Sequence, residues 1–305
     1  MQPRLYVAVD GGATGTDMAL HDAEGRRLTR LQLGPTSLTL KGESAWRDLL
    51  PALGALLSEA GRDPATALSG CAMGLGLAGV NNETMRRAFV AAAPTLARLH
   101  VASDAYIAAL GAHGGAAGAV VSVGTGSVGY RIYADGRARM AGGWGFPIDD
   151  AGSGSWLGHR AIRQALEVLD GRHFDTPSPT GFHRAVLDHL GGTREAILDW
   201  LHAAPSTKYA ELAPVVLEHA ADGDSHALRL ARAAGVEIDR LATALDPARE
   251  APFALVGGLA GPFEPYLPEA LRRWMRPALG DALSGALLLA RARAPEERFF
   301  IGSEG

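Results

Sequence analysis

Two short stretches of this sequence combine glycines with hydroxyl side chains, which is the composition of a phosphate-binding loop. Residues 10–16 read Asp-Gly-Gly-Ala-Thr-Gly-Thr, and residues 124–127 read Gly-Thr-Gly-Ser. Glycine lets the backbone approach an anion with no Cβ in the way, and closely spaced N–H groups and hydroxyls can bind phosphate oxygens. The residues that we expect to contact a phosphate chain are Gly11, Gly12, Thr14, Gly124, Thr125, Gly126 and Ser127.

Either loop alone could equally be a hairpin turn that binds nothing. A Rossmann or Walker loop would lead into a helix, whereas a strand-like run follows each loop here. Residues 5–33 read as strand, glycine-rich loop, strand, turn and strand, and the same layout returns at residues 119–141. Such a duplication favours a ligand, because two hairpins can hold one phosphate chain from opposite sides.

Two aspartates stand where predicted strands end. Asp10 follows the apolar run 5–9, and burying it there without a cation would be costly. A Mg²⁺ ion held through water would stabilise the carboxylate, although Asp10 could also only cap the turn. Asp104 follows the short strand 99–102 and precedes a predicted helix over 105–112, where aspartate is also a common N-cap.

The elements that must position these residues alternate between strand and helix after the first three strands. Helices are expected over about 42–60, 83–93 and 155–169, with a glycine-rich loop at 142–154 before the last of them. Helices then dominate, over about 193–203, 207–221, 225–246, 267–276 and 281–294, with one late strand at 253–256. We expect two domains, 1–112 and 113–305, with the last helix able to pack on the first domain.

Composition excludes several classes of protein. The 305 residues are 47% hydrophobic and 20% charged, with a net charge of -4 and no basic patch, which argues against a nucleic-acid partner. The single cysteine, Cys71, reads as a small buried residue in a strand. No apolar stretch is long enough to span a bilayer, and the N-terminus lacks a signal-peptide core, so we expect no membrane contact and a cytoplasmic location.

Taken together, the motifs give the chain a resemblance to the sugar kinase, Hsp70 and actin superfamily. Within it, the chain resembles bacterial glucosamine and N-acetylglucosamine kinases and the related BadF/BadG/BcrA/BcrD-type ATPases. The resemblance implies an α/β fold of two actin-like (ribonuclease H-like) domains flanking a cleft. The matching stretches are 10–14, 103–105, 124–127, 143–145, 150–153 and 256–258.

The resemblance also implies an activity, which is ATP-dependent phosphorylation of O6 of glucosamine or N-acetylglucosamine. Asp104 would be the catalytic base and would contact the sugar, and Asp10 would hold Mg²⁺. Gly257 and Gly258 would bind the adenosine part of ATP. The other expected sugar-binding residues are Ser37, Gly143, Trp144 and Asp150.

Two of these sugar-site positions leave alternatives open. Trp144 could stack on a pyranose or be a core anchor. Mammalian-type N-acetylglucosamine kinases carry an asparagine in the loop where this sequence has about Ser37, so the preference for an acetyl group is open.

Other functions remain on the same fold, because a fold alone does not fix function. An activator ATPase would need cysteine ligands for an iron–sulfur cluster, which one cysteine per chain does not supply. A DNA-binding sugar sensor would usually add a helix-turn-helix segment, whereas this sequence enters its first predicted strand by about Leu5. A nucleotide or polyphosphate hydrolase is a further alternative. The sequence does not set the oligomeric state, for which a homodimer is one candidate.

Overall fold

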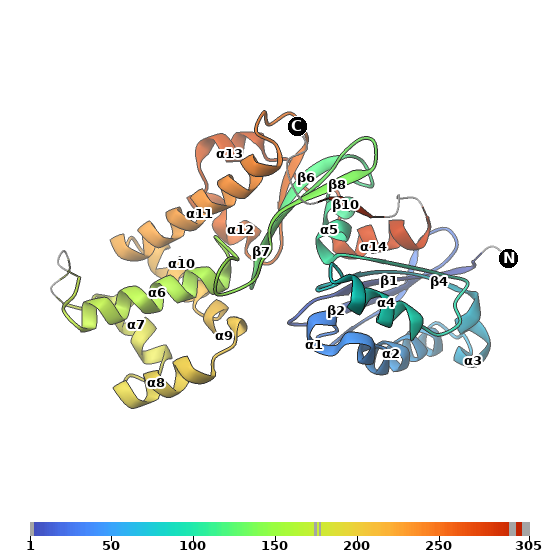
Figure 1. Cartoon of the computed structure of the whole chain (residues 1–305), viewed down its shortest axis with the longest axis horizontal. Coiled ribbons are helices and arrows are strands. Elements are labelled where there is room, and N and C mark those ends of the chain that lie inside the picture. The colour runs from blue at the N-terminus through green and yellow to red at the C-terminus, as the bar shows by residue number, and fades with distance from the viewer. Residues whose placement is uncertain (1–2, 174–175, 177, 293–296, 301–305) are drawn as a thin grey trace. The chain divides into compact units, whose positions relative to one another are not determined.

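Two five-stranded sheets organise the chain in the computed structural model, which describes residues 3–173, 176, 178–292 and 297–300 (Figure 1). The first sheet has the order β3-β2-β1-β4-β5, with β1 at Leu5–Gly11, β2 at Thr16–His21, β3 at Arg27–Leu33, β4 at Cys71–Leu77 and β5 at Arg98–Ala102. The second has the order β10-β8-β7-β6-β9, with β6 at Gly118–Val123, β7 at Ser127–Ile132, β8 at Arg137–Gly142, β9 at Phe253–Val256 and β10 at Arg298–Phe300.

The strand orders confirm the duplication expected from the sequence. In the first sheet β3, β2 and β1 are neighbours and β4 adds to β1; in the second, β8, β7 and β6 are neighbours and β9 adds to β6. Each glycine-rich loop therefore follows the strand that occupies the same place in its sheet. Because β4 and β9 occupy the same place in their sheets, the segment that follows β4 corresponds to the glycine pair that follows β9.

The chain divides into two compact units that are not continuous in sequence. The first contains Met1–Val120, Tyr130–Arg139 and Pro277–Gly305, and the second contains Val121–Gly129 and Met140–Arg276. The sequence predicts a single domain boundary after residue 112. The structure differs because β6, β7 and β8 each contribute residues to both units.

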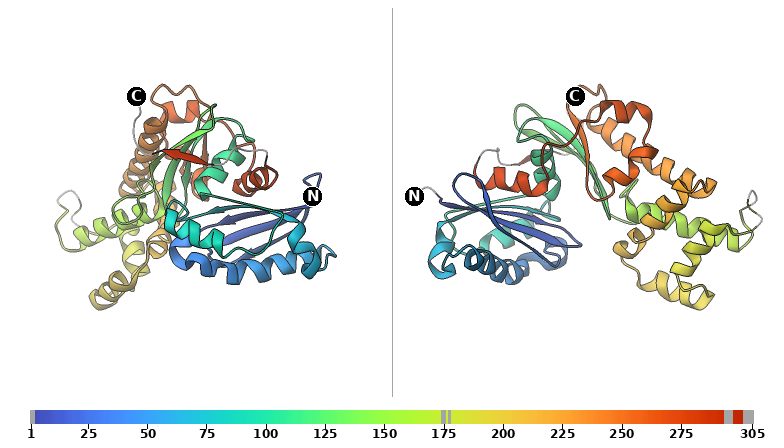
Figure 2. Two further views of the ribbon diagram at one scale, coloured as in Figure 1. Left: turned by 45° about the vertical axis from the view of Figure 1, so that its right-hand side comes forward. Right: turned by 180° about the vertical axis from the view of Figure 1, so that it is seen from behind.

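The first unit is a sheet covered by helices on both faces. Helix α2 contacts β2 and β3, whereas α5 and α14 contact β1 and β4 (Figure 2). Its core includes Val7, Leu20, Leu53 and Met73, all fully buried. The helices of this unit are α1 (Leu38–Lys41), α2 (Trp46–Glu59), α3 (Pro64–Ala67), α4 (Glu83–Ala91), α5 (Asp104–Ala112) and α14 (Ala282–Ala290).

Helices α5 and α14 approach so closely that a side chain at their crossing would not fit. A Cβ on Gly285 would lie 1.9 Å from the backbone oxygen of Ile107, and one on Gly111 would lie 1.9 Å from that of Asp281. Glycine permits this backbone contact. The C-terminal helix thereby fixes the position of the helix that begins at Asp104.

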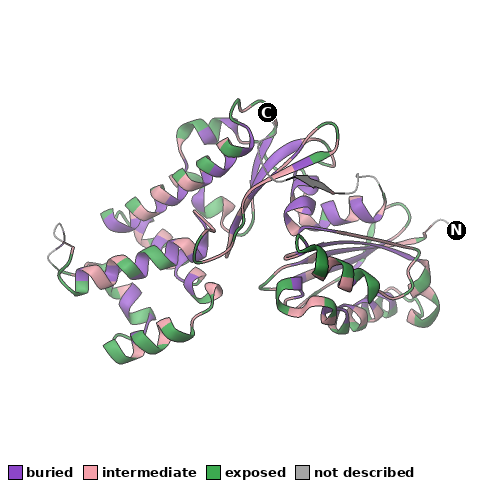
Figure 3. Ribbon diagram, in the orientation of Figure 1, coloured by how far each residue is buried: buried purple, intermediate pink, exposed green. Residues whose placement is uncertain are grey.

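The second unit is mainly helical. Figure 3 shows α8 as a largely exposed helix, and only Ile197 of α8 is buried. The helix expected over 207–221 is two helices, because Pro214 lacks an N–H and lies in the first turn of the second. The helices are α6 (Gly154–Leu169), α7 (Gly181–His189), α8 (Arg194–Ala203), α9 (Ser206–Ala210), α10 (Ala213–Ala221), α11 (Ser225–Leu245), α12 (Ala260–Phe263) and α13 (Glu269–Trp274).

Two further expectations from the sequence can be compared with the structure. Cys71 is fully buried at the start of β4, as expected, and burial raises the pKa of its thiol to about 11. Within the described residues, no helix has both the length and the apolar composition that crossing a membrane requires.

Candidate active site

The first glycine-rich loop joins β1 and β2, which pair in antiparallel fashion with Asp10 opposite Asp17 and Gly11 opposite Thr16. The Gly12 N–H donates to the Gly15 carbonyl across the loop (2.9 Å). A Cβ on Gly11 would lie 2.5 Å from Oγ1 of Thr36, so glycine is required there by a close approach.

Buried hydroxyls anchor the base of this loop and leave its tip open. Thr16 and Thr36 are buried and share a hydrogen bond between their Oγ1 atoms (2.7 Å). Thr14 at the tip is exposed. A cavity of about 390 Å³ opens beside the loop, and its lining consists of Asp10, Thr14, Gly15, Thr16, Asp17, Gln32 and Leu33. The loop is therefore a fixed turn with a free hydroxyl next to an open cavity.

Asp10 lies in a cluster of negative charge at this cavity. Burial, and then the nearby carboxylates of Asp104, Asp17 and Asp281, raise the pKa of Asp10 from 3.8 to about 7. Arg30 pairs directly with Asp17, since its Nε donates to Oδ1 of that residue (2.8 Å), and its charge also acts on Asp281. A bound cation would relieve the remaining repulsion.

The start of α5 shows which of two neighbouring residues caps the helix. Ser103, not Asp104, is the N-cap, because its Oγ accepts the Tyr106 N–H (3.1 Å). Asp104 is the first residue of the helix, and its Oδ1 accepts the adjacent Ala105 N–H (2.9 Å). Burial raises the pKa of the Asp104 carboxyl above its usual range, against the lowering effect of the Ala105 N–H. The carboxyl is thus free of the capping role and electrostatically linked to Asp10.

The second glycine-rich loop is tied to the first turn of α6. The Gly154 N–H donates to the Gly124 carbonyl (2.9 Å), and the Ser155 N–H donates to the Thr125 carbonyl (3.0 Å). The first N–H groups of a helix have no partner within the helix, and here the loop carbonyls satisfy two of them. Ser153 caps the same helix, because its side chain accepts the Trp156 N–H.

Ser127 connects this loop to the segment that contains Asp150. The Ser127 N–H donates to Oδ1 of Asp150 (3.2 Å), and its Oγ donates to the Ala151 carbonyl (2.8 Å). Asp150 itself has a φ of 62°, a left-handed conformation that costs a non-glycine residue about 1–2 kcal/mol. A Cβ on Gly126 would lie 2.7 Å from Oδ1 of Asp150. The carboxylate of Asp150 therefore packs directly against the second loop.

The loop between β8 and α6 presents Trp144 to solvent. Trp144 is 76% exposed, which excludes the alternative that it is a core anchor. Its N–H donates to Oδ2 of Asp149 (3.0 Å). The neighbouring carboxylates of Asp149 and Asp150 thus bind different segments. Gly143 has a φ of 76°, and a Cβ on it would lie 2.9 Å from Val128.

The glycine pair after β9 lies against the end of β6. Gly257 has a φ of 96°, and a Cβ on it would lie 2.4 Å from the Val123 carbonyl oxygen. The Leu259 N–H donates to the same oxygen (3.1 Å). No atom lies within 4 Å of a Cβ built on Gly258. The structure thereby places Gly257 and Gly258 next to the strand that leads into the second loop.

Ser37 caps a helix, and this structural role is independent of its predicted contact with the sugar. Its side chain is fully buried, and its Oγ accepts the Leu40 N–H at the start of α1 (3.3 Å). This geometry explains the residue as a helix cap and adds no support for a contact with sugar.

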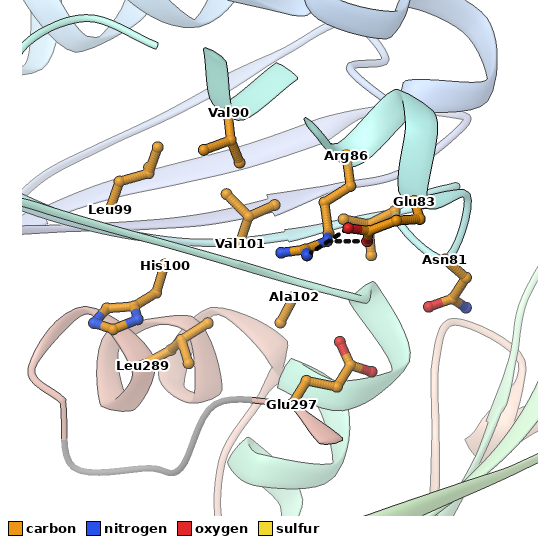
Figure 4. A pocket seen from close by; sticks show the side chains of 11 residues that line it. Asn81, Glu83, Arg86, Val90, Leu99, His100, Val101, Ala102, Leu289 and Glu297 are labelled. Atoms are coloured by element: carbon orange, nitrogen blue, oxygen red, sulfur yellow. Dashed lines mark hydrogen bonds and ion pairs between the residues drawn. The ribbon is translucent and has the colours of Figure 1, made fainter. Parts of the chain in front are cut away.

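A second cavity, of about 370 Å³, lies along β5 between α4 and α14 (Figure 4). Arg86 and Glu83 of α4 form an ion pair on its wall (2.8 Å). The remaining lining residues are Val80, Asn81, Val90, Leu99, His100, Val101, Ala102, Leu289 and Glu297. The cavity reaches the end of β5, one residue before the N-cap of α5.

Comparison with known proteins places these features in a family. The profile of the BadF/BadG/BcrA/BcrD ATPase family matches residues 7–290. The chain belongs to this family. The BadF/BadG/BcrA/BcrD match extends from β1 through α14, so it includes both glycine-rich loops, Asp104 and the glycine pair after β9.

Two relatives of this chain are described as amino-sugar kinases. The glucosamine kinase GspK of Vibrio cholerae is 30% identical over 93% of this chain and 95% of its own. The N-acetylmuramic acid/N-acetylglucosamine kinase of Clostridium acetobutylicum is 27% identical over 77% of each chain.

Solved structures confirm the fold. A Chromobacterium violaceum protein provisionally described as an N-acetylglucosamine kinase superposes with a TM-score of 0.89 at 43% identity, covering 94% of this chain and 99% of its own. A ROK family glucokinase from Streptomyces griseus has a TM-score of 0.53 at 22% identity, covering 94% and 99%. The α/β actin-like architecture predicted from the sequence is therefore confirmed.

Four residues of this family member contribute to the site although sequence reasoning missed them. Thr36 anchors the first loop, Asp17 lines its cavity, the charge of Asp281 acts on Asp10, and Glu297 binds Ser103 directly before Asp104. Asp17 was detectable, because it stands opposite Asp10 in the predicted hairpin. Glu297 lies 194 residues from its partner, and no local pattern connects them.

Proposed function

We propose that this protein is an ATP-dependent kinase that phosphorylates O6 of glucosamine or N-acetylglucosamine. Asp104 accepts the proton of the 6-hydroxyl while O6 forms a bond to the γ-phosphorus of ATP. The bond from that phosphorus to the bridging β,γ-oxygen breaks, and ADP leaves with the bonding electrons. The products are the sugar 6-phosphate, ADP and the proton on Asp104, which then passes to solvent.

The observation that supports this proposal most directly is the placement of Asp104. Ser103 is the N-cap of α5, so the Asp104 carboxyl, in the first turn of the helix two residues after β5, is not needed as the cap and accepts only the adjacent Ala105 N–H among the hydrogen bonds described above. Burial raises its pKa, which makes it a better proton acceptor than an ordinary aspartate when it is ionised. A carboxylate in this state can orient a hydroxyl and take its proton late in a loose transition state.

The negative charge beside the first loop favours a bound magnesium ion over an empty site. Burial, and then the carboxylates around it, raise the pKa of Asp10 to about 7. Among the described residues, no group of three or more His, Cys, Asp or Glu side chains is arranged to hold a metal alone. Mg²⁺ is commonly held by one or two carboxylates together with waters and substrate phosphates. We infer that Asp10 holds Mg²⁺ in this way, and the ion would neutralise charge on the phosphates.

Nucleotide and sugar contacts are divided between further residues. The backbone of Gly11, Gly12 and Thr14 and that of the second loop, 124–127, bind phosphates in this proposal. Gly257 and Gly258 contact the adenosine part of ATP. The exposed indole of Trp144 packs on the apolar face of the sugar, and Gly143 and Asp150 contact its hydroxyls. A contact between Ser37 and the sugar rests on the resemblance alone.

An ADP-release assay over a panel of sugars tests the proposal. The panel contains glucosamine, N-acetylglucosamine, N-acetylmuramic acid and glucose, each assayed with Mg-ATP and with ATP plus a chelator. We expect turnover that depends on both an amino sugar and Mg²⁺. Turnover of ATP that no amino sugar stimulates would contradict the kinase and favour a nucleotide hydrolase.

Two further proposals concern the location of the protein in the cell and its oligomeric state. The dependence on ATP favours a cytoplasmic location, which fractionation of the source cells would test. A homodimer is proposed on the resemblance only, and light scattering coupled to size exclusion measures the mass against the 31.8 kDa of one chain.

A further inference from the structure

Glu297 binds the turn that carries the proposed base. Its Oε2 accepts the Ser103 N–H (2.8 Å), and its Oε1 accepts a hydrogen bond from the Ser103 hydroxyl (2.7 Å). The hydroxyl of Tyr130 donates to the same Oε1. One carboxylate therefore takes three hydrogen bonds, two of them from the residue directly before Asp104.

The hydrogen bonds to Glu297 also affect how helix α5 is capped. The Ser103 hydroxyl gives its proton to Glu297, so its oxygen is free to accept the Tyr106 N–H (3.1 Å). Burial, together with the Glu297 charge, holds the pKa of Tyr130 above its usual range, so this phenol stays a donor. Glu297 thus fixes the direction of the hydrogen bonds that cap α5.

The two ends of α5 are held by the same C-terminal part of the chain. Near its C-terminal end, the helix contacts α14 through Gly111 and Gly285, where no side chain intervenes. At its N-terminal end it is held by Glu297, which also lines the cavity along β5 beside Ala102 (Figure 4). Without Glu297, the buried Ser103 N–H would lose its partner, and the first turn would be free to shift.

We propose that Glu297 is a positioning residue for phosphoryl transfer: it holds the Ser103–Asp104 turn so that the Asp104 carboxyl meets the substrate hydroxyl in a reactive geometry. The proposal rests on the proposed function of Asp104. A catalytic carboxyl must be placed within about 0.5 Å, and neighbouring hydrogen bonds commonly provide that precision. Glu297 does not itself touch the reacting atoms in this scheme.

Three variants separate positioning from general stability. Glu297→Ala removes the carboxylate, Glu297→Gln keeps an oxygen that can accept the Ser103 N–H, and Tyr130→Phe removes only one of the three bonds. Glu59→Gln on the exposed face of α2 is the matched control. For each variant, kcat and KM for sugar and Mg-ATP are measured, along with hydrogen–deuterium exchange of peptides covering Ser103–Tyr106 and α2.

Positioning predicts a specific pattern. Glu297→Ala lowers kcat about 100-fold with KM for Mg-ATP within about threefold of the parent value, because misplacement acts on the reacting geometry. Glu297→Gln recovers at least about tenfold of that loss. Exchange rises at Ser103–Tyr106 and not in α2. If Glu297→Ala does not fold, the glutamine and phenylalanine variants still test the pattern.

Two results would overturn the inference. One is unchanged kcat and exchange in Glu297→Ala or, if that variant does not fold, in both remaining variants. The other is a rise in exchange spread over the whole first unit, with kcat and KM altered together. If the parent protein turns over no sugar, the proposed function fails, but the exchange data still decide whether Glu297 holds the turn.

Discussion

The two glycine-rich loops share a layout, but their surroundings differ. The first lies beside an open cavity lined by Asp10 and Asp17, and the charges of Asp104 and Asp281 also act on Asp10. The second has its carbonyls bonded to the first turn of α6 and its Ser127 bonded to the Asp150 segment. One loop is acidic and open, and the other is braced by hydrogen bonds.

The two loops show that a duplicated supersecondary unit can carry different chemical groups in its two copies. Carboxylates at the first loop can hold a cation and move a proton, so changes there should act on kcat or on Mg²⁺ dependence. The braced loop offers shaped backbone and a packed glycine, so changes there should act on nucleotide binding and stability. Each of the following experiments tests one side of this division.

The largest effect is expected for Asp104→Asn, which removes the proposed base from the acidic side. We expect kcat to fall by about 10²–10⁴-fold, because this is the usual contribution of a general base. KM for Mg-ATP should change little, since Asp104 is not part of either loop. Steady-state kinetics with Glu59→Gln as control measures this. Near-normal turnover would remove Asp104 as the base.

Asp10→Asn should weaken the apparent affinity for Mg²⁺ by about 10–100-fold, the range typical for carboxylates that support a metal site. Titrating activity with Mg²⁺ at fixed ATP measures the effect. Ser58→Ala, on the exposed face of α2, is a control for handling and should leave the titration unchanged. An unaltered Mg²⁺ dependence would place the cation elsewhere.

The same variant should change the pH dependence of stability in the absence of nucleotide. The folded-state pKa of Asp10, about 7, lies above the unfolded value near 3.8, so its stabilising contribution is present below pH 3.8 and lost as pH rises to 7. An asparagine at this position cannot ionise, so the variant should gain in Tm relative to the parent as the pH rises from about 4 to about 7 and stay ahead above it. A variant less stable than the parent at about pH 8 would contradict the acidic cluster.

On the braced side, Gly257→Ala should destabilise the protein by about 1–2 kcal/mol, because alanine is unfavourable at a φ of 96°. Its Cβ would also meet the Val123 carbonyl at 2.4 Å, which adds to the cost. Gly258→Ala is the matched control, since nothing lies within 4 Å of its Cβ. Thermal unfolding without nucleotide measures the difference, and equal Tm values for the two variants would count against the packing described here.

Ser127→Ala should have the smallest effect. It removes the partly buried hydrogen bond to the Ala151 carbonyl, worth about 1 kcal/mol. We expect a small loss of Tm and a rise of a few-fold in KM for Mg-ATP with kcat kept, in contrast to Asp104→Asn. A large fall in kcat would mean that the second loop also contributes to the chemical step.

Local patterns predicted much of this molecule. Apolar runs and glycine loops located β1, β2, β6 and β7 and revealed the duplicated layout, and the resemblance of the motifs to a known superfamily implied the fold. Helix termini were approximate, and the break at Pro214 was missed because proline fits the first turn of a new helix as well as a loop.

The candidate site was predicted only where its residues form local motifs. The loops, Asp10, Asp104 and the glycine pair after β9 could be proposed from neighbouring residues. The choice of Ser103 over Asp104 as N-cap could not, because both are good capping residues and only backbone conformation distinguishes them. The exposure of Trp144 was likewise undecided, since an aromatic residue in a loop can pack inward or outward.

The sequence by itself determined the order of strands, loops and acids, because hydrophobic periodicity and glycine requirements act over a few residues. The tertiary structure decided how distant groups act on one another. It placed Asp17 and Asp281 close enough to Asp10 for their charges to act on it. It also packed Gly257 against the Val123 carbonyl and joined Glu297 to Ser103 across 194 residues. Charge interaction and close packing depend on distance in space, and chain order alone does not specify that distance.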